Sequence, residues 1–322
     1  SGNDYGSGGI HVNGSGEVTF AGSSSSADYA TTAGAYKETL GGSADAVVGK
    51  LNAAGNALLY STFYGGDASS ESAGGMAVDA AGDVYFTGQT LSNNLPTVNA
   101  YDSSFTGSSD IYVAKLTMAG GGTSDLLYST YLGGGTDYER SNGIAVDDSG
   151  KVYVVGPAFS GHPTTAGAFQ TTMEGTSDAF LSVLDTNVSG PGGLVYSTFI
   201  GGSGSEEAHD VYYRASDGYV YISGQTTSTN FDTTTGAFQE TSGGGTDGFL
   251  AIIKGPDNRE QGLFHPRAVA VNTKTGHIYA AAAYSLRVDH FQPDGTFIKS
   301  FAQGDREGPV FNTAQQVAVD PR

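Results

Sequence analysis

The sequence contains no cysteine and no tryptophan, and it is poor in positive charge. Without cysteine there can be no disulfide, no thiolate metal site and no cysteine nucleophile. Only 14 Lys and Arg residues stand against 33 Asp and Glu residues, so the net charge is -19. A surface of this sign repels nucleic-acid phosphates and anionic lipids. We therefore expect no nucleic-acid partner.

Long hydrophobic runs are also absent. The longest run of small apolar residues, IYAAAAY at 278–284, has the length of a strand, whereas a membrane-spanning helix needs about 20 apolar residues. We expect no membrane insertion. The chain opens at Ser1 without methionine or a charged, apolar leader, which predicts a mature exported product or a fragment of something longer. The many serines, threonines and glycines favour an extracellular or cell-surface location.

Glycine and aromatic residues, by contrast, are abundant, with 50 Gly, 19 Tyr and 16 Phe. Aromatic and β-branched residues favour strands, and glycine favours the turns between them. One heptapeptide occurs three times with its tyrosines 68 residues apart: YSTFYGG (60–66), YSTYLGG (128–134) and YSTFIGG (196–202). These features predict an all-β repeat architecture.

Each repeat contains four strand-like segments. The first two, such as GGMAVD (74–79) and GDVYFTG (82–88), predict a hairpin. A longer loop leads to a third segment such as DIYVAKL (110–116), and the heptapeptide is the fourth. Its closing glycines are expected to let the chain turn inward to the next repeat. Because the strands are apolar on both faces, we predict a β-propeller of five or six blades, each a four-stranded antiparallel meander.

The repeated segments resemble a known family. NGIAVD (142–147), GKVYVVG (150–156), PTTAGAF (163–169), DAFLSVL (178–184) and YSTFIGG (196–202) are similar to the bacterial and archaeal SBBP repeat. The resemblance covers about residues 1–254 and implies blades at 1–66, 67–134, 135–202 and 203–258. It implies a secreted or surface-attached propeller and carries no catalytic residues. Residues 259–307, with AVAVN (268–272) and GTFIKSF (295–301), resemble one NHL repeat, another type of propeller blade.

The C-terminal part of the repeat array differs from its middle. The fourth repeat lacks the heptapeptide after Ile253, which predicts a vacant sheet edge, and residues 308–322 hold a strand without a hairpin partner. Three interpretations are open. The strand closes the ring of its own chain, or it pairs with a second copy and builds a filament, or the chain is a piece of a longer protein. The strand consists of Gln315, Gln316, Val317, Ala318, Val319 and Asp320.

Aspartate and asparagine recur at two fixed positions. Residues that end the first strand enter a turn, and their side chains are expected to cap its backbone: Asn13, Asp79, Asp147, Asn272 and Asp320. Aspartates begin the third strand in all four long repeats, and this uniformity predicts a hydrogen bond that builds the blade: Asp45, Asp110, Asp178 and Asp247.

Acidic residues before the first strands vary between repeats. We expect them near the mouth of the central channel, where they form a solvated acidic rim or, alternatively, hold a cation such as Ca²⁺. The sequence has no D-x-[DN]-x-[DN]-G loop that would support the cation. The candidate ligands are Glu71, Glu139, Glu206, Glu207, His209 and Asp210, and Asp4, Asp67 and Asp137 stand in the same loops.

The sequence also lacks the H-E-x-x-H, G-x-S-x-G and G-x-x-x-x-G-K-[ST] motifs. We therefore expect no catalytic residues and no cofactor. The favoured hypothesis is a non-enzymatic exported propeller, a structural or adhesive surface module that self-assembles through its termini. One alternative is a domain whose long loops bind a glycan or a peptide through residues such as Tyr101. Another, based on the resemblance to metal-dependent NHL-like lyases and hydrolases, is a metal enzyme around His209.

Overall fold

The computed structural model describes residues 2–135, 138–254, 261–264, 268–272, 274–282, 287–293 and 297–302. Within these ranges the chain is almost entirely β, with two short 3-10 helices, η1 (Gly122–Asp125) and η2 (Pro191–Gly193). The predicted strand at 315–320 and Asp137 lie outside the described residues.

The described strands form five antiparallel sheets. The first contains β1 (Asp4–Tyr5), β2 (Ile10–Val12), β3 (Val18–Ser24), β4 (Asp45–Leu51) and β5 (Leu58–Tyr64). The second contains β6 (Glu71–Val78), β7 (Val84–Thr90), β8 (Asp110–Leu116) and β9 (Leu126–Leu132). The third contains β10 (Gly143–Val146), β11 (Lys151–Ala158), β12 (Asp178–Asp185) and β13 (Leu194–Ile200). The fourth contains β14 (Glu206–Arg214), β15 (Tyr219–Thr226), β16 (Asp247–Lys254) and β17 (Gln261–Phe264), and the fifth contains β18 (Ala268–Val271), β19 (Ile278–Ala282), β20 (Arg287–Phe291) and β21 (Phe297–Ala302).

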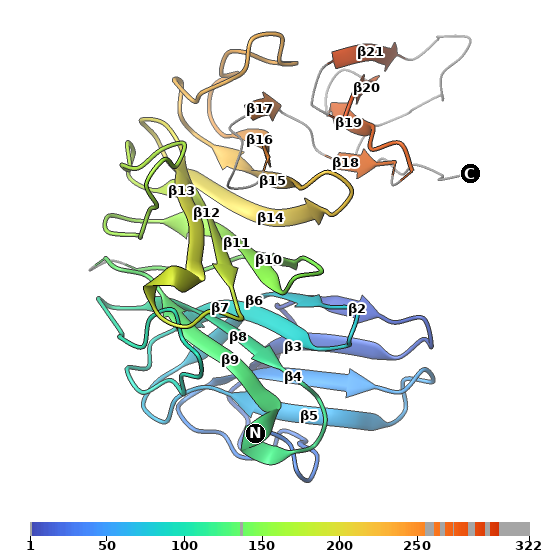
Figure 1. Cartoon of the computed structure of the whole chain (residues 1–322), viewed down its shortest axis with the longest axis vertical. Coiled ribbons are helices and arrows are strands. Elements are labelled where there is room, and N and C mark those ends of the chain that lie inside the picture. Colours follow the sequence, from blue (N-terminus) through green and yellow to red (C-terminus); the bar gives the residue numbers. More distant parts are fainter. Residues whose placement is uncertain are drawn as a thin grey trace.

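Strands pair in chain order within the sheets, except that the short β1 and β2 both pair with β3. The first strands of neighbouring sheets touch, since β6 contacts β2 and β10, and β10 also contacts β14. Figure 1 shows the sheets following one another along an arc, from the first (blue) to the fifth (orange). Small antiparallel meanders stacked in this way are the blades of a β-propeller, so the prediction of an all-β propeller is confirmed.

Apolar layers fill the junctions between the sheets, as the strands with two apolar faces predicted. Between the first and second sheets, Val48 and Tyr64 pack with Phe86 and Tyr112. Similar layers join the second sheet to the third and the third to the fourth, and Ile278 packs against the fourth sheet. Burying one large apolar side chain contributes about 1.5–3 kcal/mol. These layers are therefore the main source of stability.

The fourth sheet is complete, which corrects the prediction of a vacant edge after Ile253. The strand β17 pairs antiparallel with β16, from Leu250 opposite Phe264 to Ile253 opposite Gln261. The sequence QGLF has only two apolar residues and no heptapeptide, so it was assigned to the following NHL-like unit. This strand fills the edge that the donation hypothesis had assigned to a strand from another copy.

The heptapeptide connects the outer strand both to the long loop and to the next sheet. Thr62 accepts a hydrogen bond from the Lys37 backbone N–H at 2.8 Å, and its hydroxyl donates to the Lys37 carbonyl at 3.1 Å. The Tyr60 hydroxyl reaches the second sheet and donates to the buried Asp125 carboxylate at 2.9 Å. The clamp made by Thr62 recurs at Thr130 and Thr198. The fixed interval of the heptapeptide therefore repeats the threonine clamp in each of the first three sheets.

Candidate functional site

Three pairs of carboxyl groups lie at the junctions between sheets, and we call them the acid pairs. In each, an aspartate begins the third strand of one sheet and a glutamate stands at the start of the next sheet. Parallel bridges between the preceding residues, such as Ala44 with Ser70, bring the two backbones together. All six residues are at most 1% exposed. The first pair is Asp45 with Glu71, the second is Asp110 with Glu139, and the third is Asp178 with Glu206.

The closing glycines of the heptapeptide hold the acid pairs. The second glycine donates its N–H to the glutamate, as Gly66 does to Glu71 at 3.0 Å, and the bond recurs at the other two pairs. At the first glycine a Cβ atom would collide with carboxyl oxygens of the pair, which belong to both members at Gly65 and Gly133 and to Asp178 at Gly201. None of these glycines has a φ in the left-handed region. Their backbone conformation therefore does not itself require glycine, and what these positions require is room for the close approach of the carboxyl groups.

Burial shifts the acid pairs toward their neutral forms. It raises the pKa of Glu71 above its ordinary value. Burial raises the pKa of Asp110 to about 6, and the Glu139 carboxylate adds to the increase. Burial also raises the pKa of Asp178, with Glu206 acting in the same direction. One member of each pair thus has a greater tendency to hold a proton than an exposed carboxyl group.

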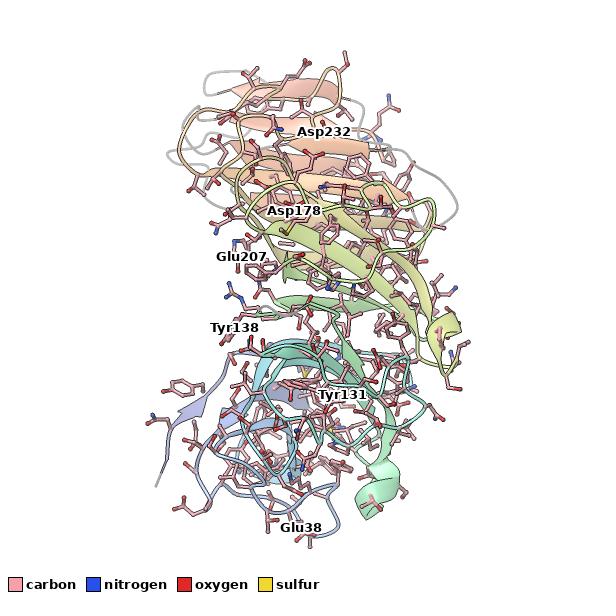
Figure 2. The ribbon with its side chains drawn as sticks, turned by 90° about the vertical axis from the view of Figure 1, so that its left-hand side faces the viewer. Glu38, Tyr131, Tyr138, Asp178, Glu207 and Asp232 are labelled. Atoms are coloured by element: carbon pink, nitrogen blue, oxygen red, sulfur yellow. The ribbon has the colours of Figure 1, made fainter. Side chains whose placement is uncertain are left out.

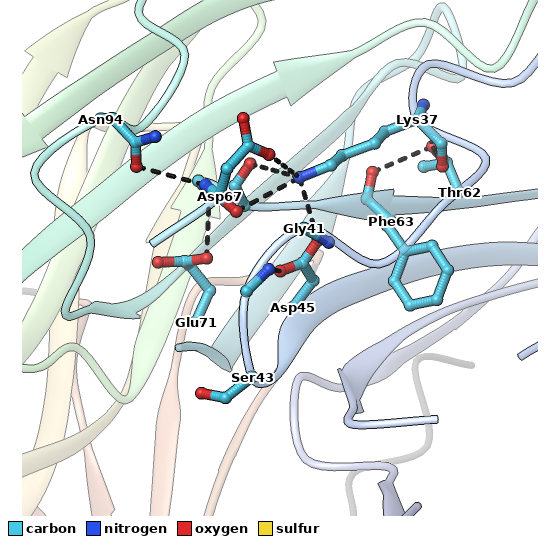
Figure 3. Close-up of polar contacts among 12 residues, drawn as sticks. Lys37, Gly41, Ser43, Asp45, Thr62, Phe63, Asp67, Glu71 and Asn94 are labelled. Carbon is cyan, nitrogen blue, oxygen red and sulfur yellow. Dashed lines mark hydrogen bonds and ion pairs between the residues drawn. The ribbon is translucent and has the colours of Figure 1, made fainter. Parts of the chain in front are cut away.

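Polar side chains satisfy the first acid pair. Figure 3 shows Lys37 reaching over it, with Nζ 3.1 Å from an Asp45 oxygen and 2.9 Å from the Gly65 carbonyl oxygen. The Thr90 hydroxyl donates to Glu71 at 2.7 Å. A buried carboxylate is tolerated when such partners compensate for lost water.

The third acid pair has a similar set of partners without the lysine. Gln170 stands where Lys37 stands in the first repeat, and its Nε2 donates to Asp178 at 2.6 Å. Glu206 accepts hydrogen bonds from Thr226 and Ser228, both at 2.6 Å.

The second acid pair departs from this pattern at three aligned positions. Asp102 replaces the lysine or glutamine, Ala158 replaces the threonine, and His162 replaces an asparagine. The His162 ring compensates, with Nδ1 3.1 Å from Glu139 Oε1 and Nε2 3.1 Å from Ser182 Oγ. The aligned positions of the other sheets have Gly49, Ala114 and Ala251 in place of Ser182. The sequence analysis did not predict these hydrogen bonds between Glu139, His162 and Ser182. The alignment of the 68-residue repeats nevertheless shows the unusual His162 and Ser182.

Glu139, His162 and Ser182 are hydrogen-bonded in the same order as the acid, histidine and serine of a hydrolase triad. All three side chains, however, are buried in the interior of the protein. Ser182 is 0% exposed and its hydroxyl also bonds Ser197 at 2.8 Å. The His162 ring packs on Phe180 with centroids 4.3 Å apart. An acylating serine needs access for a substrate carbonyl and donors for an oxyanion. In this arrangement the chain of hydrogen bonds fastens β12 to the loop that carries His162.

The candidates at the channel mouth do not converge. Glu206 is buried in its acid pair, while Glu207 binds Arg140 at 2.7 Å and Asn142 at 2.9 Å. His209 and Asp210 are exposed at a bulge of β14. Figure 2 shows Glu207 at one side of the molecule, whereas Asp178 lies over the sheet. Burial raises the pKa of Glu207, but the hydrogen bonds from Arg140 and Asn142 outweigh it and leave the pKa lowered.

The described ranges hold no group of three or more His, Asp or Glu side chains arranged to bind a metal ion. No helix in the same ranges is long and apolar enough to cross a membrane. Tyr101, the residue suggested for ligand binding, is partly buried against the layer between the second and third sheets.

The predicted capping roles are confirmed where the structure describes them. Asp79 accepts the N–H groups of Ala81 and Asp83, both at 2.9 Å. Matching bonds occur at Asn13, Asp147 and Asn272. The aspartates that begin the third strands accept backbone N–H groups three or four residues earlier, at Asp45, Asp110, Asp178 and Asp247.

Comparison of the chain with known proteins does not assign it to a family. No family model matches the chain, and no curated protein matches it. A hydrazine synthase structure from Kuenenia stuttgartiensis shares 11% identity at a TM-score of 0.45, over 85% of this chain and 72% of that one. Virginiamycin B lyase from Staphylococcus aureus shares 10% identity at a TM-score of 0.45, over 95% of this chain and 74% of that one. Likeness of this degree carries no argument about function.

Proposed function

We propose that the protein is a non-enzymatic propeller of the SBBP and NHL type, exported and used as a structural module that self-assembles. The observation that carries the proposal is the internal use of the reactive side chains. The acid pairs and the Glu139, His162 and Ser182 chain are buried and bonded to the backbone and side chains of neighbouring sheets. Side chains that could act as acids, bases or nucleophiles are therefore used to connect neighbouring sheets.

The composition supports the same proposal. A protein without cysteine does not depend on the redox state of its surroundings. Its net charge of -19 keeps separate particles apart at low ionic strength. Polymers of such a protein are expected to form most readily where salt screens this repulsion.

The test is the state of the purified full chain, measured by mass photometry over a dilution series and by negative-stain electron microscopy. We expect strings or filaments of disc-shaped particles that grow with concentration. Monomeric discs at every concentration and at high salt would contradict self-assembly. Elemental analysis covers the enzymatic alternative, because a stoichiometric metal that is lost in His209→Ala would favour a metal enzyme over a structural module.

A further inference from the structure

Five residues form a hydrogen-bond chain at the junction between the second and third sheets. The Glu139 carboxyl group lies 3.1 Å from Nδ1 of His162, and Nε2 of the same ring lies 3.1 Å from Ser182 Oγ. Ser182 Oγ lies 2.8 Å from Ser197 Oγ, which in turn lies 2.5 Å from the carbonyl oxygen of Pro163. The four side chains are at most 4% exposed. Bulk water therefore cannot supply a hydrogen that the residues themselves lack.

The direction of these hydrogen bonds is fixed from the carbonyl end. A carbonyl oxygen can only accept, so the Ser197 hydroxyl donates its one hydrogen to Pro163. Ser197 then has only lone pairs for Ser182, and Ser182 donates to it. The Ser182 hydrogen is thereby used, and its oxygen has only lone pairs for the His162 ring. Nε2 of His162 must therefore carry a hydrogen.

The other end of the hydrogen-bond chain is the Glu139 carboxyl group. An ionised carboxylate can only accept, so its contact with His162 requires a hydrogen on Nδ1 as well, and the ring is then an imidazolium. If Nδ1 has no hydrogen, the Glu139 carboxyl group has to supply one instead. In both cases Glu139 and His162 together hold one proton more than a carboxylate beside a neutral imidazole.

The supply of hydrogens shows what loss of this proton would do. The hydrogen-bond chain consists of four hydrogen bonds, and each needs one hydrogen. The two serines supply two, and a neutral imidazole supplies only one. Without the extra proton, one buried contact is left with lone pairs on both sides, which is unfavourable where water cannot enter. The folded state therefore favours the protonated form.

The second sheet has the same serine contact without a histidine. Ser129, the serine of its heptapeptide, donates to the carbonyl oxygen of Pro96 at 2.5 Å. Its own hydrogen is then used, so it accepts from the Tyr64 hydroxyl at 2.6 Å. A neutral phenol supplies the hydrogen there, and no extra proton is needed. The extra proton is thus a consequence of His162 and Ser182, and not of the heptapeptide serine.

The surroundings of the His162 ring favour a positive charge. The titratable groups that face it are Glu139, from the loop before β10, and Asp110 of β8, the partner of Glu139 in the second acid pair. From β12 and β13 the ring meets Phe180, with centroids 4.3 Å apart, and Phe199, with centroids 6.2 Å apart. The Asp178 carboxyl group of β12 belongs to the next acid pair, and the Arg140 guanidinium forms its ion pair with a different carboxylate. Carboxylates and aromatic faces both attract a cation.

We propose that Glu139 and His162 form a pH-sensitive lock on the junction between the second and third sheets, closed by one buried proton. In the unfolded chain a histidine releases its proton above about pH 6.5. The folded state then binds more protons than the unfolded state, so stability falls as the pH rises. The contribution of the lock is complete below about pH 6.5 and is lost as the folded junction gives up its proton in the alkaline range. The inference does not depend on self-assembly.

The direct test is nitrogen NMR of the full chain labelled with 15N-histidine at about pH 7.5, where an exposed histidine such as His209 is mainly neutral. The two ring nitrogen shifts distinguish an imidazolium from each of the neutral tautomers. The His162 signals are identified by their absence in His162→Asn. We expect an imidazolium, or a ring with hydrogen on Nε2 alone beside a protonated Glu139. A ring with hydrogen on Nδ1 alone would overturn the inference.

Two serine variants separate the lock from a histidine with a purely structural role. In Ser197→Ala the Ser182 hydrogen is free to be donated to Nε2, so the remaining hydrogen bonds need no extra proton. We therefore expect His162 in this variant to be neutral at about pH 7.5, with its hydrogen on Nδ1. Ser129→Ala is the matched control, because it removes the same heptapeptide serine from the second sheet and should leave His162 protonated. A His162 ring that stays protonated in Ser197→Ala would contradict the assigned hydrogen-bond directions.

Hydrogen exchange of the β12 and β13 amides measures the effect on the junction. Circular dichroism first establishes that each variant is folded, and the exchange rates are corrected for their intrinsic dependence on pH. Between about pH 6 and about pH 9 we expect protection in the wild type and in Ser129→Ala to fall at least about tenfold. Protection in Ser197→Ala should fall less, because it has no buried proton to lose. Equal losses in all three proteins would show that the proton does not lock the junction.

Discussion

The second acid pair and its two neighbours occupy the same place in successive junctions, yet different side chains surround them. Around the first and third pairs, threonine donates to the glutamate, and Lys37 or Gln170 binds the aspartate. Around the second pair, His162 binds Glu139 and neither a lysine nor a glutamine is present at the aligned position. The glycines and their N–H bonds are the same in all three.

This difference separates what the junction requires from what it tolerates. The close approach of the first glycine to a carboxyl group of the pair recurs in all three junctions, because a Cβ atom would occupy the same space as the carboxyl oxygens. The donors vary, because a buried carboxylate needs hydrogen bonds but does not need them from one residue type. Three predictions test this distinction, and they are given in order of the effect that we expect.

The largest effect should come from the invariant glycines. We expect Gly65→Ala and Gly133→Ala each to lower the free energy of unfolding by about 1–3 kcal/mol, because the added methyl group displaces the acid pair. Urea denaturation followed by circular dichroism measures the change. Gly14→Ala is the control, since nothing lies within 4 Å of a Cβ atom there. Equal stability of all three variants would contradict a steric requirement at the acid pairs.

An intermediate effect should appear in the pH dependence of the second pair. The pKa of Asp110 is raised from 3.8 to about 6, so the folded state holds its proton more tightly than the unfolded state does. The stability that this group contributes is full below pH 4 and is lost as the pH rises through 6. We expect that loss to be about 2 kcal/mol. It should be absent in Asp110→Asn, which keeps an oxygen that can accept the Thr106 N–H bond.

Denaturant titrations at several pH values between 4 and 7 make this comparison. The remaining acidic residues contribute a common background in both proteins, so only the difference between wild type and variant is informative. Parallel stability curves for the two proteins would show that Asp110 does not titrate in this range.

The smallest effect should follow from converting the second junction to the pattern of its neighbours. The double variant Ala158→Thr with His162→Asn restores the donors found at Thr90 and Thr226 and the acceptors found at Asn94 and Asn230. We expect its free energy of unfolding to stay within about 1 kcal/mol of the wild type, because exchanged partners cost little when no donor is left unpaired. His162→Ala alone should cost more, since Glu139 and Ser182 both lose a partner. A double variant that is less stable than His162→Ala would show that the junctions do not share one pattern.

The strand arrangement could be predicted from the sequence because it depends on local signals. Alternating apolar residues, glycine turns and the 68-residue interval place β6 to β9 and their counterparts without knowledge of distant contacts. The strand β17 was missed because a four-residue strand is defined by its partner β16 and not by its own pattern. Its assignment needed the register of the sheet.

The site was predicted less well, for a related reason. Glu71, Glu139 and Glu206 were grouped together in the sequence, but they were expected in loops at a solvated mouth, whereas all three are buried and Glu71 and Glu206 begin strands β6 and β14. Their partners come from other segments, as Thr90 does for Glu71 and His162 for Glu139. From sequence alone a carboxylate is expected to be exposed, and burial can be predicted only when the groups that donate hydrogen bonds to it are recognised. The presence of His162 at the position that is aligned with Asn94 and Asn230 is the feature of the sequence that could have indicated a different partner for Glu139.

The packing of each sheet against the preceding sheet also bears on how such a chain can grow in evolution. A unit of 68 residues contains one face to be covered and one face that covers. Duplicating a whole unit within the gene therefore preserves every junction, whereas a duplication that begins inside a sheet separates part of an apolar face from the sheet that covers it. Gene duplication that keeps whole units intact is thus the route that leaves a foldable product at each step.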